Sequence, residues 1–244
     1  MQKLLVPMTT TVAAPLAALC IGAPIASADT TASSAAQQSG HGVAISVNGK
    51  TVIQKGNATA TSDPGHNIAV AINGSTASAT AGSRNIAIAI NGSTAKVSGT
   101  GNSALALNQS RAGNLGSPGT GSGNRYVAIN TSRAGDGGAA DASSGGRAFA
   151  MNGSSADVYS GNNNTATATN NASASANNGN DNIAVGRNGG QAIASRGNNN
   201  RAFADGDGSA AYAVNGDNNT ATARCGGLAF ASGDDQTATD GTCD

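Results

Sequence analysis

Two of the three cysteines in this chain could form a disulfide bond with each other. Cys225 and Cys243 lie close together near the C-terminus, whereas Cys20 lies near the N-terminus. In an oxidising compartment such a pair forms a disulfide. We predict a Cys225–Cys243 disulfide that fastens the C-terminal end of the fold, a cross-link that contributes about 3 kcal/mol through loop entropy. Two free thiols are the alternative.

Residues for acid–base catalysis are scarce. The two histidines, His41 and His66, lie in the glycine-rich turns SGHG and PGHN, and the chain has no glutamate. No nucleophile motif and no converging acid and base accompany them. We therefore predict a protein that is not an enzyme and has no cofactor and no metal. If the protein is an enzyme after all, the alternative is a carbohydrate-active solenoid enzyme, which would need carboxylates aligned across a groove.

Two short motifs suggest ion or ice binding. The turns DGDG (205–208) and GDGG (135–138) are similar to those of calcium-binding rolls, but that chemistry needs aspartates at every ninth position, and here they are scattered. Threonines at 165, 167, 169, 220 and 222 could order water if the array persisted across neighbouring repeats, but it is interrupted by Ile183 and Val185 and by Arg201 and Phe203. An ice- or calcium-binding solenoid stays an alternative function.

The composition is that of a neutral chain of small residues. Its 244 residues include 35 glycines, no tryptophan, three phenylalanines and three tyrosines, and 13 basic side chains balance 13 acidic ones. Without a basic cluster or interleaved aromatic residues, we expect no nucleic-acid partner. Disordered chains are usually rich in charge and proline. This chain has five prolines, so regular repetition explains the composition better.

The N-terminal segment 1–28 is typical of a secretory signal peptide. Lys3 precedes a largely apolar segment, and Ala26-Ser27-Ala28 has the small-x-small form of a cleavage site, which predicts cleavage between Ala28 and Asp29. A lipoprotein signal ending at Cys20 is the alternative, although Leu19 is large for its position. No later segment is apolar over the length that a membrane span needs. We expect a signal peptide (1–28), a flexible segment (29–42) and a repeat domain (43–244) with no membrane span, secreted or held at the cell envelope.

The rest of the chain repeats a short unit. Residues 67–95 read NIAVAINGSTASATAGSRNIAIAINGSTA, in which NIA(V/I)AINGSTA occurs twice, first from Asn67 and again from Asn85. A period of about 18 residues predicts stacked coils. Cys225 and Cys243 are one such period apart, which would place them at the same corner of successive coils. The asparagines that close the apolar runs are Asn48, Asn73, Asn91, Asn108, Asn130, Asn152, Asn170 and Asn188, and the register continues through Gly206 and Cys225.

Each unit contains two alternating segments joined by turns rich in Gly, Asn and Ser, a pattern typical of β-strands. We predict an all-β fold, a narrow parallel β-solenoid (β-roll) of about ten coils with an alanine-lined interior, because the two strands of so short a coil lie close together. The inward positions are expected at Ala71, Ala89, Ala106, Ala128, Ala150, Ala168, Gly186, Ala204 and Ala223, and at Ala77, Ala95, Ala112, Ala134, Ala156, Ala174, Ala192, Ala210 and Ala229.

The positions between these alanines must then point outward, yet many are apolar. An apolar ribbon of this length suggests burial by self-association, most simply in a cyclic oligomer. The alternative inverts the faces and makes the aliphatic residues the core, although Arg187, Asp205 and Arg224 in the same columns would not suit a tight core. The predicted ribbon is Val70, Ile72, Ile88, Ile90, Leu105, Leu107, Val127, Ile129, Phe149 and Met151.

Units such as NIAVAINGSTASATAGS and NSALALNQSRAG resemble the head repeats of trimeric autotransporter adhesins over roughly residues 43–232. In that family small residues fill each roll and larger aliphatics meet at the trimer axis, so the resemblance implies a homotrimer with the ribbon at its centre. The period here is longer, and we expect neither a coiled-coil stalk nor that family's C-terminal anchor, so adhesion is an analogy. A weaker resemblance to exported actinobacterial repeat proteins adds no function.

Two further features concern binding. Insertions at 114–124 and 135–146 should project as adjacent loops, which are either a partner site or featureless bulges. Five anchor asparagines begin Asn-x-Ser/Thr sequons that the repeat itself produces, and their side chains are expected to stack from coil to coil: Asn73, Asn91, Asn108, Asn130 and Asn152. We predict an exported, non-enzymatic structural and binding protein, adhesin-like, at the cell surface or outside the cell, with an unspecified surface or host ligand.

Overall fold

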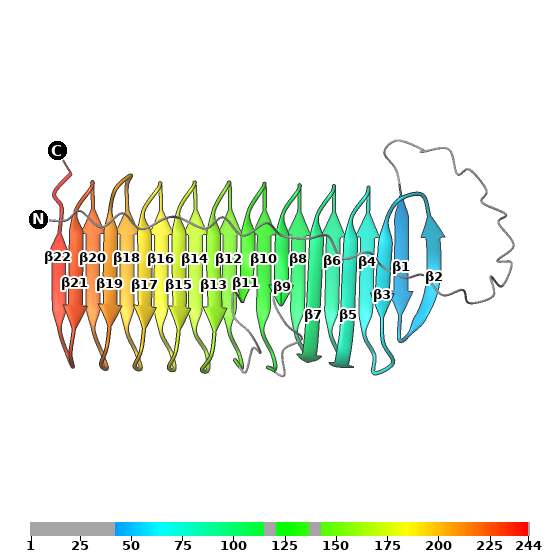
Figure 1. Cartoon of the computed structure of the whole chain (residues 1–244), viewed down its shortest axis with the longest axis horizontal. Coiled ribbons are helices and arrows are strands. Elements are labelled where there is room, and N and C mark those ends of the chain that lie inside the picture. Colours follow the sequence, from blue (N-terminus) through cyan, green and yellow to red (C-terminus); the bar gives the residue numbers. More distant parts are fainter. Residues whose placement is uncertain (1–41, 115–120, 137–142, 244) are drawn as a thin grey trace, which may run out of the picture. The chain divides into compact units, whose positions relative to one another are not determined.

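Two long β-sheets form from the alternating segments. The computed structural model describes residues 42–114, 121–136 and 143–243, all within the unit Gln37–Asp244, and in these ranges the chain forms strands and no helix. Figure 1 shows the strands in one row from β22 to β2. The predicted signal peptide, the cleavage point between Ala28 and Asp29, and the segment 29–41 lie outside the described residues.

The first strand of each coil belongs to a 12-stranded sheet, called sheet A, and the second to a 10-stranded sheet, called sheet B. In spatial order, sheet A contains β2 (Lys50–Lys55), β1 (Val43–Val47), β4 (Ile68–Ile72), β6 (Ile86–Ile90), β8 (Ser103–Leu107), β10 (Arg125–Ile129), β12 (Arg147–Met151), β14 (Thr165–Thr169), β16 (Ile183–Arg187), β18 (Arg201–Asp205), β20 (Thr220–Arg224) and β22 (Thr237–Asp240). Sheet B contains β3 (Thr59–Ser62), β5 (Thr76–Ser83), β7 (Thr94–Thr100), β9 (Arg111–Asn114), β11 (Arg133–Asp136), β13 (Ser155–Tyr159), β15 (Ser173–Asn177), β17 (Gln191–Ser195), β19 (Ala210–Val214) and β21 (Leu228–Ser232).

From β4 to β21 the strands alternate between the two sheets, which makes nine complete coils in the described part of the chain, close to the predicted ten. Neighbouring strands of these coils pair in parallel, as the repeat predicted. The predicted fold class, a parallel β-solenoid whose coils follow the period of the repeat, is therefore confirmed.

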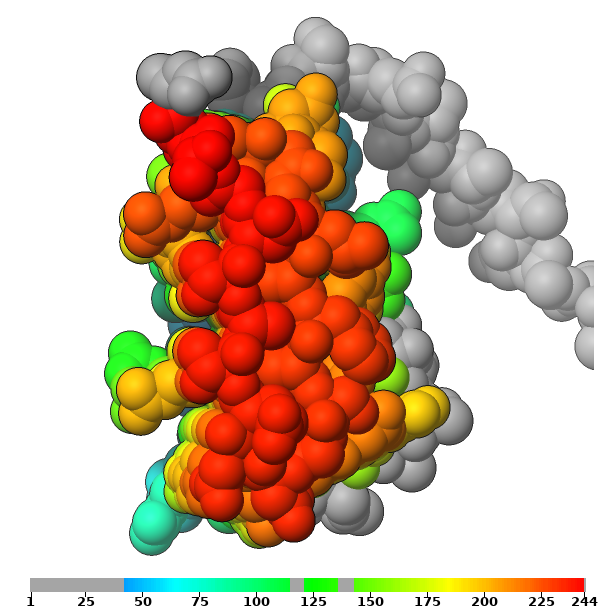
Figure 2. Space-filling model, turned by 90° about the vertical axis from the view of Figure 1, so that its left-hand side faces the viewer, coloured from blue at the N-terminus to red at the C-terminus, as the bar shows by residue number. Residues whose placement is uncertain are grey.

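Alanine lies beside alanine along the interior of the stack. Ala71 pairs with Ala89 and Ala89 with Ala106, and all three side chains are 0% exposed. Figure 2 looks onto the C-terminal coil, whose atoms leave no open channel. The alanine-lined interior is confirmed, and the alternative with inverted faces is wrong. Close approach of the two sheets excludes larger side chains from most of this space.

One of the predicted inward positions differs from expectation, whereas Gly186 lies inward as predicted, in register with Ala168 and Ala204. Ala210 faces outward, and Ala211, which is 0% exposed, takes the interior position instead. The reason is that the turn 206–209 is one residue longer than the equivalent turn 188–190, and one added residue moves the other face of a strand inward. At Gly186 even a methyl group would lie 2.5 Å from the carbonyl oxygen of Ser173, so this coil excludes alanine.

Larger side chains enter the interior beside the two insertions. Tyr126 is 1% exposed and pairs with Ala104 and Ala148, so a phenol ring occupies an alanine position. Strands β9 and β11 contain four residues each and end where the insertions begin, which leaves room at this level. Val158, which is 0% exposed, lies against Gly146. At Tyr126 and Val158 the interior therefore departs from the predicted alanine lining.

The N-terminal end is a hairpin and not a further parallel coil. Strand β1 pairs antiparallel with both β2 and β4, so the prediction that placed Asn48 in the common register is wrong. Asn48 and Gly49 have φ angles of 52° and 81°, as a two-residue Asn-Gly hairpin turn requires, and this turn reverses the chain before it can enter sheet B. Lys50 and Lys55 then lie on the outermost strand, where charge opposes pairing with another sheet edge.

Candidate functional site

The outward face of sheet A carries a continuous apolar surface over β4, β6, β8, β10 and β12. All ten predicted ribbon residues lie on this face and are half-buried. In-register pairing places Val70 beside Ile88 and Ile72 beside Ile90. We call the following set the apolar ribbon: Val70, Ile72, Ile88, Ile90, Leu105, Leu107, Val127, Ile129, Phe149 and Met151.

The apolar surface is larger than the ribbon that the sequence predicted. Ile68 and Ile86, which are 36% and 41% exposed, add a third column on β4 and β6. The antiparallel pairing of β1 places Ile45 beside Val70 and extends the surface by one more strand. The third column could have been found in the sequence, because IAVAI and IAIAI each contain three outward positions.

Polar side chains end the apolar surface at β14, where three threonines occupy the outward columns. Thr167 lies between Phe149 of β12 and Val185 of β16, so the threonine array is one strand wide at this point. A flat array across several coils, which an ice-binding face would need, is therefore not formed around β14. Farther along, the guanidinium groups of Arg187 and Arg224 lie 5.4 Å and 5.8 Å from the ring centre of Phe203.

The anchor asparagines form a ladder along the outside of the turns. Nδ2 of Asn73 donates to Oδ1 of Asn91 at 2.8 Å, and the bond repeats until Nδ2 of Asn188 donates to Oδ1 of Asp205 at 2.8 Å. Their φ angles of 49° to 59° lie in the left-handed region, which asparagine tolerates well. The predicted stacking is confirmed. The members are Asn73, Asn91, Asn108, Asn130, Asn152, Asn170 and Asn188.

A second asparagine ladder is buried just before the strands of sheet A. Oδ1 of Asn182 accepts the backbone N–H of Asn200 at 3.0 Å, and its Nδ2 donates to the carbonyl of Gly197 at 2.9 Å. This ladder was not predicted from the sequence, although an asparagine opens the units NIAVA, NSALA and NTATA. The members are Asn67, Asn85, Asn102, Asn124, Asn164, Asn182, Asn200 and Asn219.

Asp157 is a partly buried acid on the outward face of sheet B. Burial raises the pKa of its carboxyl, while the charge of Arg133 and the hydrogen bond from Ser155 act in the opposite direction and are weaker. Ser155 Oγ donates to Oδ2 of Asp157 at 3.3 Å, whereas Oδ1 is buried and accepts no hydrogen bond. Arg133 and Ser155 therefore offset only part of the free-energy cost of burying the ionised carboxylate.

Asp157→Asn should stabilise the protein at neutral pH by about 1 kcal/mol, because it removes a buried charge whose oxygen has no partner. The folded-state pKa lies above the ordinary value of 3.8, so the folded protein loses stability as pH rises through that pKa. The gain should be present at neutral pH and vanish as pH falls below 3.8. Urea unfolding of both proteins at neutral pH and below pH 3.8 measures the difference in the free energy of unfolding. The exposed control Asp207→Asn should change stability little, and a gain for Asp157→Asn that is independent of pH would contradict the prediction.

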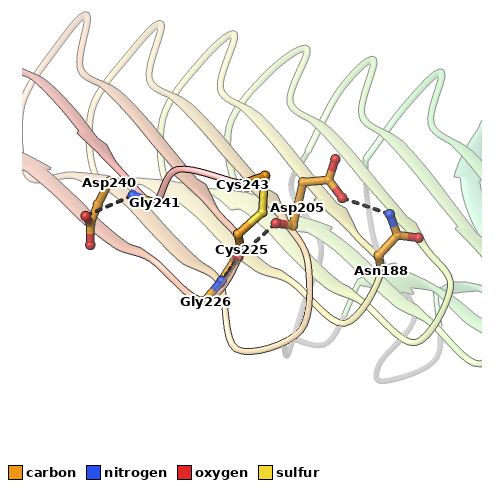
Figure 3. The surroundings of a disulfide bond; sticks show 8 residues. Asn188, Asp205, Cys225, Gly226, Asp240, Gly241 and Cys243 are labelled. Atoms are coloured by element: carbon orange, nitrogen blue, oxygen red, sulfur yellow. Dashed lines mark hydrogen bonds between the residues drawn. A yellow bond between two sulfur atoms is a disulfide. The ribbon is translucent and has the colours of Figure 1, made fainter.

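Cys225 and Cys243 close the C-terminal end. Their Cα atoms are 5.5 Å apart and their sulfur atoms lie at disulfide distance, which agrees with the predicted pairing (Figure 3). The backbone N–H of Cys225 donates to the carbonyl of Asp205 in the preceding coil at 3.0 Å. Oδ2 of Asp240 accepts the backbone N–H of Leu228 at 2.7 Å. The cross-link ties the corner after β20 to the segment after β22.

Cys243→Ser should reduce the stability of this end by up to about 3 kcal/mol. Each coil of a repeat protein contacts only its neighbours, so the loss should be concentrated in β20, β21 and β22. Amide hydrogen exchange measures it strand by strand. A reducing agent should reproduce the effect in the unaltered protein and add nothing to the variant. Unchanged exchange in these three strands would contradict the prediction.

The described structure does not bring the other candidate residues, the histidines and the scattered aspartates, together into one site. Within 42–114, 121–136 and 143–243, no group of three His, Cys, Asp or Glu side chains could hold a metal ion. His66 lies in a turn with a φ angle of 66°, and Asp205 accepts from Asn188. His41 and most of both predicted binding loops, at 115–120 and 137–142, lie outside the described residues. The absence of a cofactor stays a prediction.

Comparisons with family models, with curated proteins and with solved structures find no match for this chain. The resemblance to adhesin heads therefore stays a prediction that depends on the repeat pattern. Where the structure describes the chain, no helix is long and apolar enough to cross a membrane.

Proposed function

We propose that this protein is an exported, non-enzymatic structural and binding protein that forms a closed homo-oligomer through the apolar ribbon and has an adhesin-like role at the cell surface or outside the cell. The observation that carries the proposal is the ribbon, ten large apolar side chains on five neighbouring strands that face away from a filled interior. An apolar face this contiguous is typical of an interaction surface.

A second copy of the chain is the occupant that the ribbon fits best. None of its ten positions carries a charge, so two ribbons can meet without burying an unpaired ion. The coils have the same spacing in every copy, which lets parallel copies bring equivalent strands to the same level around a common axis. A trimer is the closed form that the resemblance to adhesin heads implies.

The polar side chains of the coils support a structural role. Most of the anchor asparagines bond to one another, and the buried asparagines bond to the backbone of neighbouring coils. These groups stabilise the stack and are not free to act on a substrate. Export is supported by the signal-like residues 1–28 and by the paired cysteines, which suit an oxidising environment.

Sedimentation equilibrium of the purified protein under non-reducing conditions tests the assembly, and we expect the mass of a trimer. Leu105→Asp places a charge on the central strand of the ribbon and should give monomers that keep their β-sheet circular dichroism. The control Thr222→Asp lies on the same face beyond the ribbon and should leave the mass unchanged. An unaltered protein that stays monomeric at every concentration would overturn the proposal.

A further inference from the structure

Three basic side chains that are distant in the sequence gather on the outward face of sheet B. The register of β7, β9 and β11 stacks Thr94, Arg111 and Arg133 in one column, with Lys96 in the neighbouring column. These four residues line a hollow of about 480 Å³. No basic cluster is visible in the sequence, because Lys96, Arg111 and Arg133 lie in three different coils.

Glycines leave space beside the arginines. In the column of Lys96 the next two coils have Gly113 and Gly135, and the following coil has Asp157. Gly113 has a φ angle of 111°, and a methyl group there would collide with the carbonyl oxygen of Lys96. No other residue fits at this position, so the two coils that carry Arg111 and Arg133 present no side chain at these two positions.

Positive charge is concentrated in this hollow. Arg111 and Arg133 lie on adjacent strands, about 4.8 Å apart along the stack. Like charges paired in this way repel each other. Among the side chains that the structure describes, the carboxylate whose charge interacts with these cations is that of Asp157, which acts on Arg133. The partly buried Asp157 faces Arg133 from the next coil and is held by Ser155. An anion placed between the guanidinium groups would relieve the repulsion.

We propose that this hollow, the cationic groove formed by Thr94, Lys96, Arg111 and Arg133, binds oxyanion groups of an acidic polysaccharide, that is, sulfate, phosphate or carboxylate groups. A guanidinium group binds two oxygens of such a group in one plane, and lysine adds a point charge. Cations on successive coils suit a polymer with repeated anionic groups better than a single ion. The proposal does not depend on assembly through the apolar ribbon, because groove and ribbon lie on different sheets.

Isothermal titration calorimetry at low salt tests the groove with sulfated dextran, unsulfated dextran, inorganic sulfate and inorganic phosphate. We expect the sulfated polymer to bind at least ten-fold more tightly than either inorganic ion, unsulfated dextran not to bind, and affinity to fall as sodium chloride screens the charges. Arg111→Gln combined with Arg133→Gln should reduce affinity for the sulfated polymer at least ten-fold, and Lys96→Gln should reduce it by a smaller factor.

The matched control is Arg125→Gln combined with Arg147→Gln. These arginines are also in-register neighbours, but they lie on sheet A, outside the groove, and the double variant removes the same charge. It should bind like the unaltered protein. Equal losses in the two double variants would overturn the proposal, because general charge attraction would then explain binding. Failure of the unaltered protein to bind sulfated dextran would also overturn it. Inorganic sulfate or phosphate bound as tightly as the polymer would overturn the assignment to a polysaccharide.

Discussion

Ala166→Leu should destabilise the protein by more than about 3 kcal/mol. Ala166 is 0% exposed in β14 and lies between Ala148 and Ala184, which are 2% and 0% exposed. Three added carbon atoms have no space in an interior where neighbouring strands also present methyl groups, so the two sheets must separate locally. Urea unfolding measures the loss, and amide exchange should place it in β14 and the coils on either side.

The neighbouring residue provides the control for this variant. Thr167 is half-buried on the outward face of the same strand, where Phe149 and Val185 flank it. Thr167→Leu places the same leucine side chain on the outward face, where space exists, and it should change stability by less than about 1 kcal/mol. Similar losses for Ala166→Leu and Thr167→Leu would contradict the assignment of inner and outer faces.

Asn182→Ala should cost about 4 kcal/mol, because the substitution removes hydrogen bonds to three backbone groups, the weakest being the 3.3 Å bond to the carbonyl of Asn177. The N–H of Asn200, a residue that is 0% exposed, loses the Oδ1 acceptor at 3.0 Å, and the carbonyl of Gly197 loses its donor at 2.9 Å. Water reaches this position poorly, and alanine also leaves a cavity. Thermal unfolding measures the change.

Asn162→Ala is the matched control for the buried ladder. Asn162 also bonds to an asparagine one coil away, with its Nδ2 at 2.9 Å from Oδ1 of Asn180, but its side chain is exposed. Water can replace this bond, so the cost should stay below about 1 kcal/mol. If the buried and exposed variants lost the same stability, burial would not be the source of the effect.

Much of the repeat architecture can be predicted from the sequence because each coil repeats the same local pattern. Alternation in segments such as IAVAI identifies strands, and the alanine columns identify the inner face, as the buried Ala71 and Ala89 confirm. The spacing of Cys225 and Cys243 equals one coil, so their proximity follows from the period. These features depend on positions within one unit or on the distance between equivalent positions.

The predictions that failed concern places where the local pattern changes. An Asn-Gly turn at Asn48 reverses β1, although its apolar run is similar to those of the coils. One extra turn residue moves Ala211 inward in place of Ala210. Short strands beside the insertions admit Tyr126. The predictions placed each residue by its distance in sequence from the anchor asparagine. That distance does not show whether a strand is reversed, whether a turn is longer, or whether the strand in the opposite sheet is short.

The sequence by itself determined that the chain is an all-β stack of short coils with alanine inside, because period, alternation and residue size each restrict what such coils can bury. Only the tertiary structure decided which outer residues become neighbours. Lys96, Arg111 and Arg133 meet because parallel pairing brings residues of successive coils to about 4.8 Å from each other. The extension of the apolar surface onto Ile45 likewise depends on the antiparallel pairing of β1. Register between strands is set by backbone hydrogen bonds and turn lengths across the whole stack, and it therefore decides the surface chemistry of this protein.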